Sequence, residues 1–214
     1  MPHYLASAFI LALILAPHAA MAGAAKPVSE QLPPFHALSI SPLVALKFTQ
    51  GPTQSVSVTA IPTMRDHLDL AVHNGVLEVH TKGDLTSFSM NDHSILLTIT
   101  LPQLTRIDDS GLVHGTLSNL SEPSLTLDLS GAASLTLTGH VQNLTTKISG
   151  DARLHARHLT IENLNAQISG VGKIEADVTK SVTLAISGVG HVHITGNPSV
   201  RHVHASGVSS VSFN

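Results

Sequence analysis

The feature that most constrains the fold is a Ser-Gly step that recurs six times in the second half of the chain. Successive steps lie 20, 19, 20, 18 and 19 residues apart. A near-constant period of about 20 residues is typical of a stacked repeat, in which each unit buries its apolar face against its neighbours. The six steps are Ser110-Gly111, Ser130-Gly131, Ser149-Gly150, Ser169-Gly170, Ser187-Gly188 and Ser206-Gly207.

Apolar and polar residues alternate on both sides of each step. After Ser130, for example, the apolar residues are Ala133, Leu135 and Leu137, and polar residues separate them. The positions one, three and five before each serine are also mostly apolar. Strict alternation indicates strands with one buried side. Because similar residues recur at the same place in successive repeats, the sequence predicts an all-β parallel solenoid with turns of roughly 20 residues.

The glycine of each step is predicted to have a structural role. The chain must turn sharply at the same point of every repeat, and glycine adopts a positive φ without a Cβ clash. Six serine nucleophiles are not indicated, since no general base accompanies each serine. The predicted turn residues are Gly111, Gly131, Gly150, Gly170, Gly188 and Gly207.

Residues 1–24 are predicted to be a secretory signal peptide. The apolar run from Leu5 to Ala16 has 12 residues, which is too short to span a bilayer. Small residues follow it and place the cleavage site after Ala22 or Ala24. The alternative is a retained hydrophobic anchor. We expect no membrane span in the rest of the chain.

The remaining chain is interpreted as a linker followed by one β domain. Residues 25–34 are polar and contain prolines, as expected of a linker. Residues 35–105 are predicted to be a β region continuous with the repetitive solenoid of residues 106–214. Within it, Asn74-Gly75 lies between two alternating runs and predicts a hairpin, because both central residues of such a turn need a positive φ. No convincing amphipathic helix is present.

Composition excludes several classes of function. The net charge is −3, with 11 Lys and Arg against 14 Asp and Glu, so no basic field for nucleic acid exists. The chain has no cysteine, which excludes disulfides, thiolate metal sites and a lipid-acceptor cysteine after the signal peptide. We therefore expect a periplasmic or extracellular protein without a lipid anchor and without a cofactor.

Histidine forms the first of two candidate constellations. The chain has 15 histidines, and two pairs at spacing i, i+2 lie near its end: His191 with His193, and His202 with His204. Such a pair projects from one side of a strand and can share Zn²⁺ or Ni²⁺ when further ligands are present. The alternative is a solvated surface without metal, which gains positive charge below about pH 6.5. We expect no metal and keep these four residues as the candidate ligands.

Carboxylates form the second constellation. Asp108 and Asp128 occupy the same outward position in adjacent turns, Arg106 is nearby, and Asp109 and Asp151 are placed at the turn. Solenoid enzymes that cleave polysaccharides also gather acids and a basic residue on an outer sheet. Here the acids are few, and the chain has one Tyr and no Trp to stack on sugars. We expect no catalytic residues and keep a polysaccharide lyase or hydrolase using Asp108 and Asp128 as the alternative.

Residues from about Phe35 to Asn214 resemble the bacterial head GIN domain family, whose members are described as putative auto-transporter adhesins. The resemblance lies in the order of short motifs along the mature chain, including the Ser-Gly-Ala and Ser-Gly-Val-Gly turns. Further motifs are Leu38-Ser39-Ile40-Ser41, Gly75-Val76-Leu77, Ile99-Thr100-Leu101-Pro102 and a C-terminal signature with Gly196, Asn197 and Pro198. The resemblance implies a right-handed β-helix similar to that of pectin lyases, an envelope or extracellular location, a role in adhesion and no catalytic residues.

These observations predict a non-enzymatic binding module that presents repetitive polar faces to a surface or glycan ligand of the envelope. The ligand itself is not identified by the sequence. The last Ser-Gly step begins a turn that the chain does not complete. The strand through Phe213 is therefore predicted to leave an open edge, suited to self-association or to a partner strand.

Overall fold

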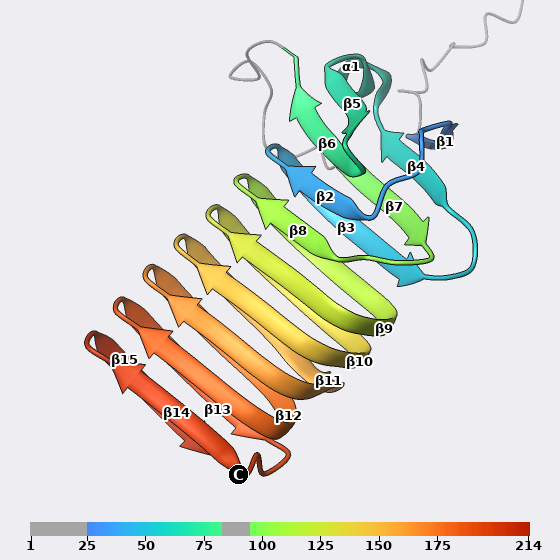
Figure 1. The fold of residues 1–214 in the computed structure, drawn as a ribbon. Coiled ribbons are helices and arrows are strands. Elements are labelled where there is room, and N and C mark those ends of the chain that lie inside the picture. Colours follow the sequence, from blue (N-terminus) through green and yellow to red (C-terminus); the bar gives the residue numbers. More distant parts are fainter. Residues whose placement is uncertain (1–24, 83–94) are drawn as a thin grey trace, which may run out of the picture.

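The computed structural model describes residues 25–82 and 95–214. They form a β-solenoid of about five turns with almost no helix, which confirms the predicted fold class. The stacked turns, called laps below, follow one another from β9 to β15 (Figure 1). The predicted signal peptide lies outside the described residues.

Each middle lap is one long strand that bends halfway. These strands are β9 (Leu112–Leu129), β10 (Ala132–Ile148), β11 (Asp151–Ile168) and β12 (Val171–Ile186). The following laps contain β13 (Val189–Thr195), β14 (Val200–Ala205) and β15 (Val208–Phe213). The N-terminal elements are β1 (Lys26–Glu30), β2 (Ala37–Ile40), β3 (Leu43–Gln50), β4 (Ser55–Ala60), α1 (Pro62–Asp66), β5 (Leu68–His73), β6 (Val76–Thr81), β7 (Ile95–Leu101) and β8 (Arg106–Asp109).

Parallel pairing between laps creates two faces. Face 1 contains the first halves of β9 to β12, which follow the Ser-Gly corners, together with β3, β13 and β15. Face 2 contains the second halves of β9 to β12, which lead into the corners, together with β2, β8 and β14. The register matches the sequence columns, since Leu135 pairs with Gly115 in the preceding lap and with Leu154 in the next.

The core is a set of aliphatic ladders between the two faces. In the ladder that precedes the corner, Leu129, Ile148, Ile168 and Ile186 are each at most 1% exposed. A fully buried side chain of this size contributes about 1.5–3 kcal/mol. Stacking such residues lap upon lap explains how a chain with 3% aromatic residues forms a stable core.

The corner glycines are required for a reason other than the predicted one. A Cβ atom at Gly150 would overlap the carbonyl oxygen of Gly131 in the preceding lap, and one at Gly170 would overlap that of Gly150. Positive φ, by contrast, occurs among the described residues at Asn74, Asn119, Asn197, Gly75, Gly139 and Gly196. The predicted positive φ at the corners is therefore wrong. Close backbone packing between laps, rather than turn geometry, excludes a side chain there.

The N-terminal region extends both faces, first with the parallel strands β6 and β7 and then with the antiparallel strands β5, β4 and β1. The predicted hairpin is confirmed: β5 and β6 pair antiparallel, and Asn74 and Gly75 have φ values of 51° and 76°. The segment expected to be a linker instead contains β1, which pairs with β4. The strand was not predicted because the segment is polar. At the edge of a sheet a strand buries little apolar surface and tolerates Pro27. The short helix α1 was also not expected, because five residues are too few to show a helical period.

Candidate functional site

A shallow furrow of about 360 Å³ runs along the Ser-Gly corners at the edge of face 2. It is lined in successive laps by the corner serine and by the residue two positions before it. We call it the corner furrow. Its polar lining residues are Asp128, Lys147, Gln167, His204, Ser149, Ser169, Ser187 and Ser206, and Ala185 occupies one place in the same column.

Strand register explains why these side chains lie together. Lys147 pairs with Asp128 in one neighbouring lap and with Gln167 in the other. Adjacent strands are separated by about 4.8 Å, so the column presents one side chain at each such step along the solenoid, and each is polar except Ala185. Alternation directs these residues outward, whereas the residues that follow them belong to the buried ladder.

Some corner serines also bind the preceding lap. The Ser130 hydroxyl donates a hydrogen bond to the carbonyl oxygen of Asp109 (3.0 Å). The Ser110 hydroxyl lies 3.3 Å from that of Ser41, which occupies the equivalent place in the N-terminal region. A hydroxyl that donates in this way keeps its oxygen as an acceptor. The serines can therefore support the corner and still accept hydrogen bonds from a ligand.

The predicted carboxylate constellation lies at one end of the furrow. Asp108 and Asp128 are register partners, and both line an adjoining hollow of about 280 Å³. Arg106 Nε donates to Asp108 Oδ1 (2.6 Å) and Oδ2 (2.8 Å), and its guanidinium lies 3.8 Å from Asp128 Oδ2. These ion pairs engage the oxygens that a general acid or base would use. Asp151 is not part of this group, because it lies on face 1, where it pairs with Arg153 at 3.8 Å.

Asp109 lies inside the core and not at an exposed turn as expected. It is 2% exposed and occupies the buried ladder between its register partners Ile40 and Leu129. Asp109 Oδ1 accepts a hydrogen bond from the Gly111 amide (3.0 Å), whereas Oδ2 has no partner among the described residues. Burial raises the pKa of this carboxyl. The signal was available in the sequence, because the position before Ser is apolar in the other repeats.

The four candidate histidine ligands do not converge. His191 and His193 lie on β13 in face 1, whereas His202 and His204 lie on β14 in face 2. His193 Nδ1 lies 2.7 Å from the Ser212 hydroxyl, and His204 lines the corner furrow. Across residues 25–82 and 95–214, no three His, Cys, Asp or Glu side chains are grouped to hold a metal ion.

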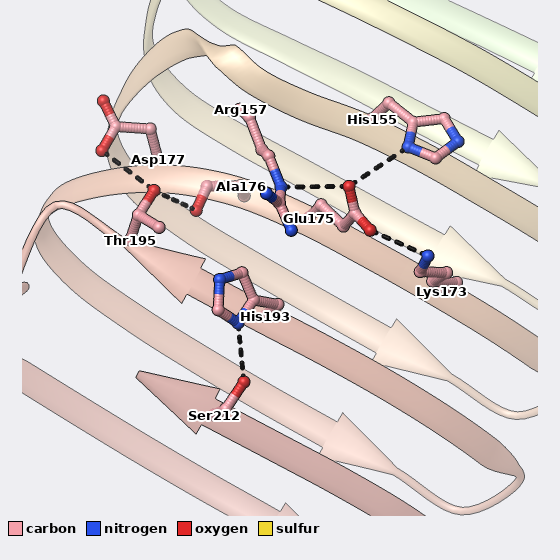
Figure 2. A network of polar contacts seen from close by, with 9 residues as sticks. All are labelled: His155, Arg157, Lys173, Glu175, Ala176, Asp177, His193, Thr195 and Ser212. Atoms are coloured by element: carbon pink, nitrogen blue, oxygen red, sulfur yellow. Dashed lines mark hydrogen bonds and ion pairs between the residues drawn. The ribbon is translucent and has the colours of Figure 1, made fainter. Parts of the chain in front are cut away.

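Glu175 is the centre of a charge cluster on face 1 that sequence reasoning did not single out (Figure 2). Its Oε1 lies 2.8 Å from Lys173 Nζ, and its Oε2 lies 3.1 Å from Arg157 Nε and 3.4 Å from His155 Nδ1. The hydrogen bond from Lys173, with His155 and Arg157 beside it, lowers the pKa of Glu175 to about 2. The cluster joins two laps, so only the register between β11 and β12 brings its members together.

The last laps show how the solenoid ends. In the inward column that holds Val182, the next lap carries Arg201, whose guanidinium lies 4.6 Å from the centre of the Phe213 ring. Val203, at another inward position, is 44% exposed. The signature residues Gly196, Asn197 and Pro198 form the bend before β14, with positive φ at Gly196 and Asn197. Self-association through this end stays a prediction.

The architecture places the protein in the class of parallel β-solenoids with a repeated corner. The family model described as "putative auto-transporter adhesin, head GIN domain" matches residues 34–198, and the chain belongs to this family. This confirms the resemblance seen in the sequence. No curated protein matches the chain.

A solved structure shares this fold, and others match the chain less well. A crystal structure named as a putative adhesin from Bacteroides fragilis is 18% identical, with a TM-score of 0.70, and the match covers 88% of this chain and 96% of that one. A putative adhesin from Parabacteroides merdae is 13% identical, with a TM-score of 0.48 and coverage of 89% and 95%. A protein named as a putative lipid binding protein from Parabacteroides distasonis is 16% identical, with a TM-score of 0.45 and coverage of 90% and 96%.

Proposed function

We propose that this chain is a non-enzymatic binding module of the adhesin type that holds an extended glycan along the corner furrow. The family and the Bacteroides fragilis structure are described as putative adhesins, which is consistent with an adhesin-like role and with an envelope or extracellular location. The location of the ligand in the furrow is supported by the chemistry of its lining.

The single observation that carries the proposal is the repeated mixture of donors and acceptors in the furrow. Carboxylate, ammonium, amide and imidazole groups follow one another along the column, interrupted only by Ala185, and the corner serines add hydroxyl groups. Sugar hydroxyls both donate and accept hydrogen bonds, so such a lining suits them. The furrow is shallow and runs across several laps, unlike a pocket that encloses a small ligand. Each lap then contributes a weak contact, and affinity comes from their number.

The arrangement of Asp108 and Asp128 suits ligand binding better than catalysis. Asp108 and Asp128 share the guanidinium of Arg106 and line the end of the furrow. A cleavage mechanism needs one carboxyl free to donate a proton and another free to attack or to activate water. In this arrangement the two carboxylates fix Arg106, and the three residues together offer hydrogen bonds to a sugar.

We infer further that the mature chain acts outside the cytoplasm. The apolar run and small residues within residues 1–24 support export, and the cleavage site is expected after Ala22 or Ala24. Among the described residues, no helix is long and apolar enough to cross a membrane. Sequencing the N-terminus of protein recovered from the periplasm and the medium tests this expectation, and a retained N-terminus in the cytoplasm would contradict it.

The experiment that tests the binding site combines a glycan array with calorimetry on the best ligand found. Lys147→Ala combined with Gln167→Ala removes two adjacent lining groups and is expected to weaken binding about tenfold or more. The control, Thr116→Ala with Thr136→Ala, alters two exposed residues of face 1 and should leave affinity unchanged. Equal losses in both variants would contradict the furrow as the site.

The same ligands also test the enzymatic alternative. Incubation with acidic polysaccharides should release no new reducing or unsaturated ends. Turnover that disappears in the variant with Asp108→Ala and Asp128→Ala would overturn the binding function and favour a lyase or hydrolase.

A further inference from the structure

Six basic or titratable side chains gather on the outer side of face 1, away from the corner furrow. They belong to β11, β12 and β13, three consecutive laps of the solenoid. We call this group the cationic strip. Its members are Arg153, His155, Arg157, Lys173, His191 and His193.

The register arranges the strip as two neighbouring columns. In the first, Arg153 pairs with Lys173, and Lys173 pairs with His191. In the second, Glu175 lies between His155 and His193. Neighbours within a column are about 4.8 Å apart, and the two columns are about 6.6 Å apart along the strands. The first column therefore repeats a basic or titratable group at lap spacing along the solenoid axis, and Arg157 lies beside Glu175 of the second column.

The cations of the strip keep donors available for a ligand. Glu175 is 15% exposed at its side chain, whereas Lys173 and Arg157, which contact it, are 48% and 52% exposed. Lysine has three donors and arginine five, and the contact with Glu175 uses only part of them. Arg153 contacts Asp151 at 3.8 Å and is 57% exposed. Glu175 thus orients the cations from below while their remaining N–H groups face solvent.

The charge balance of the strip depends on its histidines. Three permanent cations, Arg153, Arg157 and Lys173, are matched by three carboxylates, Asp151, Glu175 and Asp177. The three histidines of the strip give it a positive excess when they are protonated. With that excess, the strip attracts anions locally within a chain of net charge −3.

Two exposed valines accompany the cations along the same side. Val171 and Val189 are 48% and 37% exposed, and each lies two residues before a member of the strip. They are register partners, so they form an apolar border beside the first column. The outward positions of face 1 from β9 to β15 carry no aromatic side chain that would stack on nucleic acid bases. Small apolar contacts beside cations suit the C–H surface and the acidic groups of a charged sugar.

We propose that the cationic strip binds a linear acidic polysaccharide whose carboxylate or sulfate groups follow the solenoid axis. This site lies on the other face from the corner furrow and does not depend on ligand binding there. The repeat of cations at lap spacing matches a polymer better than a single small anion, because each lap adds one contact.

Binding at the strip strengthens as the pH falls through the range in which histidine is protonated. The imidazoles concerned are His155, His191 and His193, and the positions of β10 and β15 that pair with the strip carry serine and threonine. Protonation gives the strip a net positive charge, so affinity for a polyanion rises. The charged groups that face these histidines are Asp151, Arg153 and Arg157 on β11 and Lys173, Glu175 and Asp177 on β12.

The test measures binding of the purified protein to labelled polygalacturonate and dextran sulfate, with neutral dextran as the comparison. Binding of either acidic polymer, weakened by salt, is the expected result. The two acidic polymers distinguish carboxylate from sulfate as the preferred group. Failure of both to bind, or equal binding of neutral dextran, would overturn the proposal.

Matched charge variants locate the site. Arg153→Ser with Lys173→Ser should weaken binding about tenfold or more, whereas Lys47→Ser with Lys180→Ser removes the same charge elsewhere and should change it less than about twofold. If the first variant melts more than about 5 °C lower than wild type, Arg153→Ser alone carries the test. Equal losses in the two pairs would show that net charge, and not the strip, determines binding.

A histidine variant tests the pH dependence separately. Wild-type affinity should rise several-fold between about pH 7.5 and about pH 5.5, and His191→Gln with His193→Gln should reduce that rise while preserving affinity at the higher pH. An unchanged rise would refute the assigned role of these histidines. Because Lys147 and Gln167 lie on face 2, their variants should bind the acidic polymers normally, so failure of one site is distinguishable from failure of the other.

Discussion

The laps at the start of the solenoid differ from the later laps at two buried positions. In the ladder before the corner, Asp109 on β8 stands where the later laps carry Ile148, Ile168 and Ile186. At the opposite bend, Glu122 on β9 stands where the later laps carry Val141, Ile161 and Val178.

The two buried acids accept hydrogen bonds from backbone amides, and these hydrogen bonds have no counterpart in the later laps. Glu122 is 3% exposed, and its Oε1 accepts a hydrogen bond from the Leu104 amide (2.6 Å) in the loop between β7 and β8. Asp109 accepts one from the Gly111 amide at the first corner. A later lap satisfies its backbone hydrogen bonds by pairing with similar laps on both sides. The laps at the start of the solenoid must also hold irregular backbone, such as the loop before β8. Buried acceptors hold that backbone, and burial raises the pKa of both carboxyls.

The largest effect is expected for a substitution at the tight corner, a feature that the early and later laps share. Gly170→Val places a side chain against the backbone of the preceding lap, so it should destabilise the protein by more than about 3 kcal/mol or prevent folding. Ser169→Ala, the neighbouring control, should cost less than about 1 kcal/mol. Urea unfolding followed by circular dichroism measures both. A Val variant as stable as wild type would show that the laps are less tightly packed than described.

The second prediction sharpens the contrast at the bend. Glu122→Ala removes the partner of a buried amide and should lower the free energy of unfolding by about 2–3 kcal/mol. Glu122→Gln keeps an oxygen acceptor without the charge and should stay within about 1 kcal/mol of wild type near neutral pH. Denaturant midpoints of the two variants measure the difference. Similar losses in both would mean that the negative charge, and not the hydrogen bond, holds the loop.

The third and smallest effect concerns the corner ladder. Asp109→Leu gives β8 the aliphatic residue of the later laps and should raise stability by about 1–2 kcal/mol near neutral pH. Burial raises the pKa of Asp109 above 3.8, so the folded state binds its proton more tightly than the unfolded state. The contribution of Asp109 to the free energy of unfolding is therefore fully present below pH 3.8 and is lost as the pH rises through the raised pKa of the folded state.

The pH series provides the control for this substitution. The advantage of the leucine variant should shrink as the pH falls through the raised pKa of folded Asp109 and be smallest below 3.8, where the carboxyl is neutral in both states. Thermal melts at several pH values measure the trend. A leucine variant less stable than wild type at neutral pH would show that the hydrogen bond to Gly111 outweighs the cost of burying the carboxylate.

Local patterns predicted much of the architecture. The Ser-Gly period and the alternation around residues such as Ala133 and Leu135 predicted the solenoid, its parallel register and the inward columns on both halves of a lap. Asn74-Gly75 predicted the hairpin because its turn depends on the conformations of two adjacent residues. Family membership followed from the same ordered motifs.

Contacts between laps were not accessible to the same reasoning. The Glu175 cluster joins β11 to β12, and its members are 2 to 20 positions apart along the chain. The separation of the histidine pairs depends on which half of a lap each one occupies. Strand β1 was missed because it lies at the edge of the sheet, where burial leaves a weak pattern.

By itself, the sequence determined the period, the alternation and therefore which residues turn inward, because these depend on backbone geometry within one lap. Tertiary structure alone decided why the corner excludes side chains and that cations gather around Glu175. Those features arise where one lap meets the next. Steric overlap, desolvation and charge pairing act over a few ångströms in space, and residues about 20 positions apart come that close only when the laps stack.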